Sequence, residues 1–237
     1  MLIAMGVQTL MTAMFNSMNA GIGNLVAEGD KRKIMSVFAE LFSIRFLFSC
    51  IMCFGVLMIT PAFVSFWIGK KYVMDSLSLL LMTAILFVNL SRTTVDAYIN
   101  AYGLFGDIWA PIVEASLNVG LSIILGYYFG LHGVLSGVLI SLLLVVFCWK
   151  PYYLFRKGLD ERLSIYIFMY ARHLMAALLC GVIVCLGMRY SMVQGDTTFF
   201  DGLLGILVFS ILSTLTLLCV APGMRNLMRR FIRMCHV

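Results

Sequence analysis

Long, unbroken apolar runs dominate this chain and restrict what it can fold into. Each run approaches the ~20 residues that a helix needs to cross about 30 Å of hydrocarbon. The runs do not alternate with the period of two that barrel strands show, so helices are the expected element. Charged residues make up only 12% of the sequence, against roughly a quarter in soluble domains. We therefore expect an all-α polytopic membrane protein with about seven transmembrane helices, at residues 2–26, 36–60, 75–102, 109–130, 133–150, 164–188 and 203–221.

The lysines and arginines at the ends of these segments orient the chain. Most of them fall near residues 31–33, near residues 150–162 and after residue 222. Because cytoplasmic connections are enriched in basic residues, this distribution places all three regions in the cytoplasm, the C-terminus included. Met1 would then lie outside, in a chain with an odd number of spans and no basic signal-peptide region. One hypothesis that accounts for this is that the chain is the carboxy-terminal part of a larger transporter.

One polar stretch, Asn89–Asn100, continues directly from an apolar run. On a helix, Asn89, Arg92, Asp96 and Asn100 fall within an arc of about 80°. Two interpretations stay open. Arg92 and Asp96, at i and i+4, can neutralise each other in a helix packed among others. Alternatively, the stripe faces a functional interior, because ionisable residues at membrane depth are candidates for transport sites.

Other polar side chains interrupt the first two segments. Asn16 and Asn19 are three residues apart and share a helix face, where amides either bond across helices or line a wet cavity. Glu40 and Arg45 lie about 140° apart on a helix and are not expected to pair. Arg45 therefore needs an internal partner or an aqueous cavity.

The fourth and fifth segments are expected to form a helical hairpin. Glu114 and Asn118 share a face of the fourth segment at i and i+4. The link at His132 is too short for anything larger than a turn. We expect His132 to be a polar turn residue, with a proton-linked switch as the alternative. Small residues at spacings that let two helices approach closely are Gly126, Gly130, Gly133 and Gly137.

The cysteines and histidines give no sign of a cofactor or metal site. Cys50 and Cys53 have a C-x-x-C spacing but lie inside an apolar segment, where free cysteines usually pack as small hydrophobic residues. The three histidines are far apart in sequence and have no neighbouring ligands. We expect no cofactor and no metal.

Several short motifs occur in an order typical of one family. They are Gly23-Asn24 with Glu28-Gly29-Asp30, Phe66-Trp67-Ile68-Gly69, Arg92 with Asp96, Pro111 with Glu114 and Asn118, and Gly130 with Gly133, Ser136 and Gly137. In these residues the chain resembles the carboxy-terminal half of a bacterial polysaccharide repeat-unit flippase of the Wzx type. Such proteins belong to the multidrug/oligosaccharidyl-lipid/polysaccharide exporter superfamily, which is MATE-like.

The resemblance implies a domain organisation and an activity. It covers roughly residues 1–160, as a carboxy-terminal bundle, and is followed by two additional transmembrane helices (161–222) and a basic cytoplasmic tail (223–237). The family implies two six-helix bundles around a cavity that opens alternately to each side. It further implies transfer of an undecaprenyl-pyrophosphate-linked oligosaccharide across the bacterial cytoplasmic (inner) membrane for O-antigen or capsule synthesis. The amino-terminal bundle has no counterpart in this sequence.

Residue chemistry suggests a role for each polar group in such a transporter. Arginine binds phosphate oxygens through two parallel bonds, so Arg45 and Arg92 are expected to hold the headgroup. Amides suit sugar hydroxyls, and intramembrane carboxylates often carry protons or sodium ions. The expected sugar-binding residues are Asn16, Asn19, Asn89, Asn100 and Asn118; the expected ion-coupling residues are Asp96, Glu114 and Glu40.

Two other functions stay open. A cation-coupled multidrug exporter of the same fold would favour acidic and aromatic groups, because its cargo is cationic. A membrane-embedded glycan-modifying enzyme would need catalytic groups in a large outside loop, and no such constellation is evident. We therefore expect no enzyme activity. The expected partners are the lipid-linked oligosaccharide, membrane lipids, H⁺ or Na⁺ and polysaccharide assembly proteins; no nucleic acid is expected.

Overall fold

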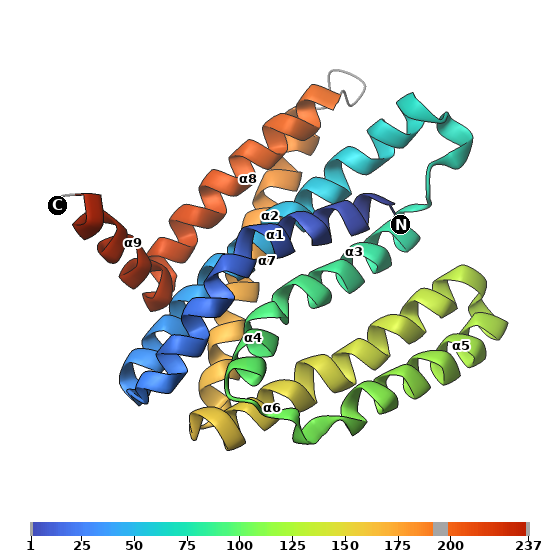
Figure 1. Cartoon of the computed structure of the whole chain (residues 1–237). Coiled ribbons are helices and arrows are strands. Elements are labelled where there is room, and N and C mark those ends of the chain that lie inside the picture. Colours follow the sequence, from blue (N-terminus) through green and yellow to red (C-terminus); the bar gives the residue numbers. More distant parts are fainter. Residues whose placement is uncertain (1, 192–198, 236–237) are drawn as a thin grey trace. The chain divides into compact units, whose positions relative to one another are not determined.

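A computed structural model describes residues 2–191 and 199–235 of this chain. Every regular element in these ranges is helical, which confirms the predicted all-α class (Figure 1). The α-helices are α1 (Leu2–Glu28), α2 (Lys31–Trp67), α3 (Ser76–Ser91), α4 (Thr93–Ala101), α5 (Trp109–Leu142), α6 (Lys150–Leu154), α7 (Leu163–Ser191), α8 (Phe199–Val220) and α9 (Pro222–Cys235). Short 3-10 or π turns are η1 (Lys70–Tyr72), η2 (Phe105–Asp107), η3 (Leu143–Trp149) and η4 (Phe155–Leu159).

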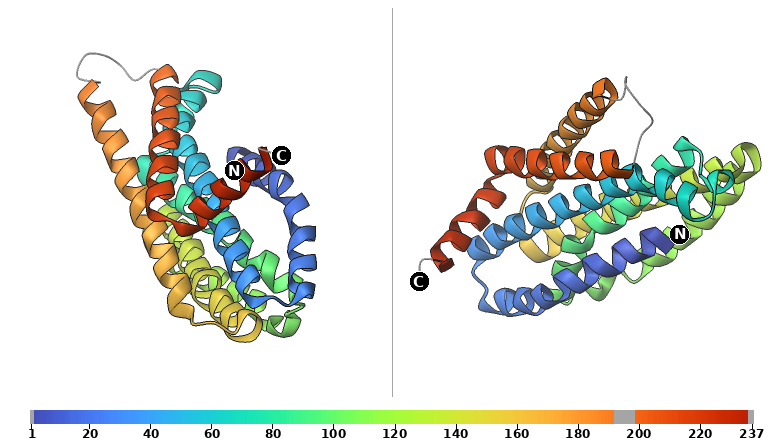
Figure 2. Two further views of the ribbon diagram at one scale, coloured as in Figure 1. Left: turned by 90° about the vertical axis from the view of Figure 1, so that its left-hand side faces the viewer. Right: turned by 90° about the horizontal axis from the view of Figure 1, so that it is seen from above.

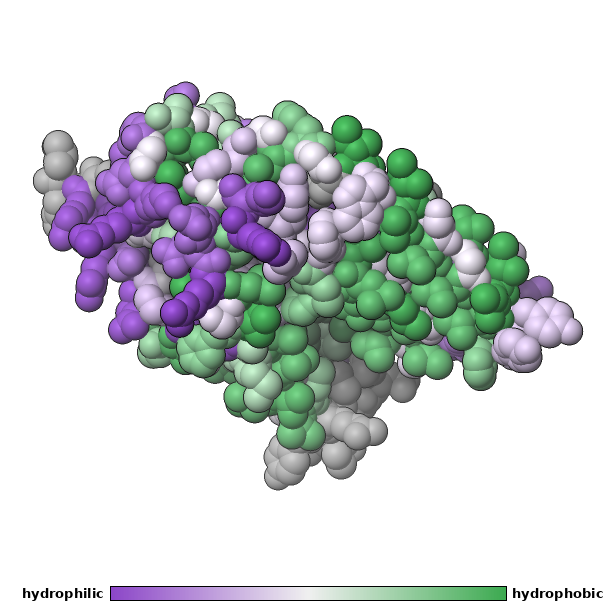
Figure 3. All heavy atoms as spheres, turned by 90° about the horizontal axis from the view of Figure 1, so that it is seen from below, coloured by the Kyte–Doolittle hydropathy of each residue, from purple (hydrophilic) through white to green (hydrophobic). Residues whose placement is uncertain are grey.

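Among the described residues, five helical stretches are long and apolar enough to cross a membrane. The protein is therefore an all-α, multi-pass membrane protein, and hydrophobic residues cover wide areas of the face drawn in Figure 3. The predicted number of seven spans is not confirmed. Helix α1 is not among the five, and the predicted fourth and fifth segments are parts of one helical stretch. The five stretches are Lys31–Trp67, Ser76–Ala101, Trp109–Leu159, Leu163–Met188 and Phe200–Val220.

Packing divides the chain into two compact units. Unit 1 consists of Met1–Met35 and Asp75–Tyr166, and unit 2 of Ser36–Met74 and Ile167–Val237. Residues 36–74 thus pack with the C-terminal helices. The division at residues 160 and 222, which follows the family resemblance, stays a prediction.

In unit 1, helix α5 reverses direction and packs against α3 (Figure 1). The reversal occurs at Gly130, whose φ of 59° and ψ of −135° suit a residue without a Cβ. The two arms then approach so closely that a Cβ on Gly133 would lie 1.9 Å from the carbonyl oxygen of Leu125. This contact confirms the predicted glycine-mediated hairpin.

Helices α3 and α4 form one helical stretch that is interrupted at Arg92. Around it, the hydroxyls of Ser91 and Thr93 donate to the carbonyls of Val88 and Leu90, at 3.2 and 2.8 Å. Such back-bonding competes with the helical ladder and bends helices. At the other end of α3, Asp75 caps the helix by accepting a bond from the Ser78 amide at 3.0 Å.

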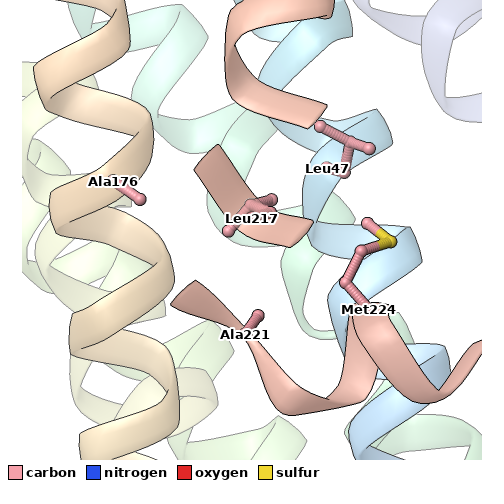
Figure 4. Packing of buried hydrophobic residues seen from close by; sticks show 5 residues of the cluster. All are labelled: Leu47, Ala176, Leu217, Ala221 and Met224. Carbon is pink, nitrogen blue, oxygen red and sulfur yellow. The ribbon is translucent and has the colours of Figure 1, made fainter. Parts of the chain in front are cut away.

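In unit 2, helices α2, α7, α8 and α9 share a hydrophobic cluster (Figure 4). Helix α9 starts at Pro222, where the chain changes direction after α8 (Figure 2), as expected of a proline that cannot continue the helical ladder. Gly223 permits close contact with α2, because a Cβ there would lie 2.3 Å from the carbonyl oxygen of Ala39. The cluster consists of Leu47, Ala176, Leu217, Ala221 and Met224.

Candidate functional site

Four charged side chains of unit 1 meet in what we call the charged cluster: Arg92, Asp96, Glu114 and Lys150. Asp96 is its centre. One of its carboxylate oxygens (Oδ2) lies 3.2 Å from the Arg92 Nε, and the other (Oδ1) accepts a bond from the Lys150 Nζ at 2.7 Å. The Arg92 Nη1 also lies 3.8 Å from a Glu114 carboxylate oxygen. Two acids therefore face two bases.

Three separate segments deliver these groups. Arg92 and Asp96 are one turn apart across the α3–α4 break, Glu114 lies in the first arm of α5, and Lys150 begins α6. Their side chains are 30%, 27%, 20% and 16% exposed, in the order Arg92, Asp96, Glu114 and Lys150. The cluster is thus partly buried.

The Arg92–Asp96 pair that the sequence predicted does form, but it is not an isolated pair. Asp96 bridges two cations, and Arg92 contacts two carboxylates. Charges in a membrane-spanning segment are costly unless each has a partner. In the cluster each charge has at least one partner of opposite sign, and removing any one member unbalances two carboxylates against two cations.

The predicted sugar-binding amides make local contacts or lie at the surface. Asn89 donates its side-chain amide to the Ile85 carbonyl at 3.0 Å, and the Asn118 oxygen accepts from the Ser122 hydroxyl at 3.2 Å. Asn100, Asn16 and Asn19 are exposed. Asn118 follows Glu114 by one turn on α5 and so adjoins the cluster, whereas Asn16 and Asn19 lie on α1.

The remaining predicted site residues, Glu40 and Arg45, belong to unit 2. Both are buried, at 4% and 2% exposure. Glu40 accepts a bond from the Ser36 hydroxyl at 3.1 Å and lies 3.3 Å from the Arg230 Nη2. Glu40 is thus held by the C-terminal helix. The expectation that Glu40 and Arg45 do not pair stays a prediction.

Sequence reasoning missed Lys150 as a site residue. It was counted among the basic residues that mark a cytoplasmic connection. One signal was present: Lys150 directly follows the apolar run that ends at Trp149 and precedes Pro151. A lysine one residue from a span can turn its long side chain back along the helix. Its partner, Asp96, is distant in sequence and was not evident.

A serine–histidine pair in unit 2 was also missed. The Ser43 Oγ lies 2.9 Å from the His173 Nε2, and the Met169 carbonyl accepts from the His173 Nδ1 at 2.7 Å. Such a pair is part of many hydrolytic sites. Here both side chains are fully buried, and the imidazole packs between the rings of Phe42 and Phe46. No substrate reaches this pair, so we interpret it as a packing contact.

Metal binding has no geometric basis in the part of the chain that the structure describes, where no three His, Cys, Asp or Glu side chains could hold one ion together. Comparisons with protein-family models, with curated proteins and with solved structures find no match for this chain. The fold and the site thus define a class, a multi-pass helical membrane protein with a charged cluster inside one of its units. The resemblance to flippases stays a prediction.

Proposed function

We propose that this chain is part of a transporter that moves undecaprenyl-pyrophosphate-linked oligosaccharide repeat units across the bacterial inner membrane. The observation that carries the proposal is the charged cluster, because it presents two cations within a membrane-spanning part of the chain. A pyrophosphate cannot cross hydrocarbon without such groups. Arginine and lysine are the side chains that bind phosphate oxygens most strongly.

The proposed mechanism is a competition for the same cations. Without substrate, Asp96 forms ion pairs with both Lys150 and Arg92, and Glu114 also pairs with Arg92. A pyrophosphate that enters the site replaces the carboxylates as the partner of Arg92 and Lys150. The displaced carboxylates then bind the coupling ion, H⁺ or Na⁺, which links substrate binding to an ion gradient. Asn118 adjoins Glu114 and offers an amide to the first sugar.

The test is export of the glycan in the organism of origin, with the native gene replaced by variants. Arg92→Ala and Lys150→Ala are expected to abolish surface glycan, and the amount of membrane protein is measured in parallel so that lost transport is separated from lost stability. Arg32→Ala, which removes an exposed arginine of the first turn of α2, is the matched control and is expected to leave export normal. Normal export in both cluster variants would contradict the proposal.

The second candidate is a cation-coupled multidrug exporter, and the observation that favours it is the pair of carboxylates in the cluster. It predicts the opposite charge preference: removing Lys150 would improve the binding of a cationic substrate, and removing Asp96 would abolish it. Resistance of cells to cationic dyes separates the two functions. Under the flippase proposal, dye resistance is the same in Asp96→Asn, Lys150→Ala and unaltered cells.

A further inference from the structure

A hollow of about 190 Å³ lies in unit 2 between the beginning of α2 and the polar face of α9. This volume exceeds that of several water molecules at about 30 Å³ each. We call it the arginine pocket. The residues that line it are Ser36, Glu40, Asn226, Arg229, Arg230 and Arg233.

The arginine pocket is strongly cationic because α9 is amphipathic. Its lining arginines and Asn226 fall within an arc of about 100° on the helix. Three arginines face a single carboxylate, that of Glu40, so the lining has excess positive charge. A pocket with this charge and these forked donors fits a phosphate group.

Glu40 acts as a positioning residue of this pocket. It is 4% exposed, accepts a bond from the Ser36 hydroxyl and lies 3.3 Å from the Arg230 Nη2. This contact engages one end of the Arg230 guanidinium, which has five N–H donors in total. The other donors stay available, and the Arg230 side chain is half exposed.

The opposite face of α9 indicates where the phosphate comes from. Met224 is buried in the cluster of unit 2, whereas Met228 and Ile232 are 38% and 50% exposed. A basic helix with exposed apolar residues on its other face lies in the headgroup region of a bilayer. The arginine pocket is then at the depth of lipid phosphates.

We propose that the arginine pocket binds the phosphate of an anionic lipid headgroup, and so fixes α9 to the membrane and to the start of α2. Binding to the arginine pocket is independent of whether the chain moves glycans. It differs from general attraction between a basic helix and an anionic surface, because only the arginines that line the pocket take part. Arg225 lies on the same helix, is exposed and does not line the pocket.

The experiment is native mass spectrometry of the purified full chain, titrated with phosphatidylglycerol or with zwitterionic phosphatidylcholine. We expect phosphatidylglycerol to bind preferentially. Arg229→Gln and Arg233→Gln should each weaken its binding about fivefold or more, the loss expected of one charge at a membrane surface. Arg225→Gln removes the same charge and should change binding less than twofold. Equal losses of phosphatidylglycerol binding in the three variants would contradict binding in the arginine pocket.

Two further arms separate the remaining explanations. Arg233→Lys keeps the charge but loses the fork, so it should also weaken phosphatidylglycerol binding if the phosphate is held by parallel bonds. Thermal unfolding of each variant in detergent shows whether it is folded, and only folded variants are compared. Inorganic phosphate is added in parallel titrations. Displacement of phosphatidylglycerol by millimolar phosphate would overturn the lipid assignment in favour of a soluble phosphate.

Discussion

Asp96 forms two ion pairs in unit 1. Its two oxygens serve different cations, Arg92 from the same helical stretch and Lys150 from a segment 54 residues further on. Pairing of this kind offsets the cost of placing charges in a low-dielectric surrounding. The stability of unit 1 and the candidate site therefore depend on the same groups.

Lys150→Met tests this dependence. It leaves Arg92 to face both carboxylates of the cluster, and we expect a loss of about 1–3 kcal/mol of stability, since the charges of the partly buried cluster are no longer balanced. The double variant Asp96→Asn/Lys150→Met removes both charges and should be more stable than Lys150→Met. Thermal unfolding in detergent measures both. A double variant no more stable than the single one would show that the two charges are not coupled.

Asp75 provides a prediction for pH. The bond from His132 at 2.7 Å, together with the Ser78 amide, holds the pKa of Asp75 below its usual value. A carboxyl whose folded pKa is depressed stabilises the fold above its unfolded pKa of about 3.9 and loses this contribution as the pH falls through the folded value.

The stability difference between the protein and Asp75→Asn should therefore not decline between pH 7 and pH 5, and should shrink below about pH 4. Asparagine is a good N-cap, so α3 keeps its start and the variant isolates the charge. Thermal unfolding over this pH range is the measurement. A difference that is already lost at pH 5 would assign the effect to another group.

At the level of elements, the α5 hairpin depends on the absence of side chains at specific glycines. Gly130 provides the reversal, and Gly133 and Gly137 the close approach of the arms. The Ser122 hydroxyl bonds to the Val134 carbonyl across the arms at 3.3 Å. The repeat of small residues was visible in the sequence, because close helix packing in membranes requires it.

Gly133→Ala should destabilise the hairpin by about 1–3 kcal/mol, because the added methyl would meet the Leu125 backbone. Gly120→Ala is the matched control: it lies on the same helix with open space around it, and should be neutral or slightly stabilising. Thermal unfolding in detergent compares them. Equal stability of the two variants would contradict the close approach of the arms.

At the level of the whole molecule, two contacts of unit 1 join parts of the chain that the charge distribution had assigned to the same side. Lys31 pairs with Asp160 at 2.9 Å, and both belong to connections predicted to be cytoplasmic. His132 pairs with Asp75 at 2.7 Å. His132 belongs to a connection predicted to be outside, and Asp75 begins a predicted span at its outside end. The contacts agree with the predicted alternation, while the side that faces the cytoplasm stays a prediction.

The orientation is open to a direct test in bacterial cells. Green fluorescent protein fused after Val237 should fluoresce, because it folds on the cytoplasmic side. Alkaline phosphatase inserted after Lys71 should be active, because that connection is expected outside. Alkaline phosphatase activity at the C-terminus, together with its absence at Lys71, would show that the chain has the orientation opposite to the predicted one.

Part of the fold and of the site followed from the sequence alone. The α-helical class, the hairpin at Gly130 and the Arg92–Asp96 pair depend on residues within about one turn or one hairpin of each other. The number of spans did not follow. Helix α1 is long, but it carries polar side chains such as Gln8, Thr12 and Asn16 among its apolar residues, and it is not one of the five stretches that are both long and apolar enough to cross a membrane. The pairing of Lys150 and Arg230 with carboxylates was also not predicted, because the positive-inside rule counts basic residues without regard to their partners.

The sequence by itself determined that this chain is helical and belongs in a membrane, because a backbone in hydrocarbon must satisfy its own hydrogen bonds, and long apolar runs leave no other solution. Only the tertiary structure decided which charges meet. Asp96 lies with Lys150, and Glu40 with Arg230, across long stretches of chain. Such pairs form because helices that are distant in sequence pack side by side, and each buried charge is stable only beside the partner that the packing brings to it.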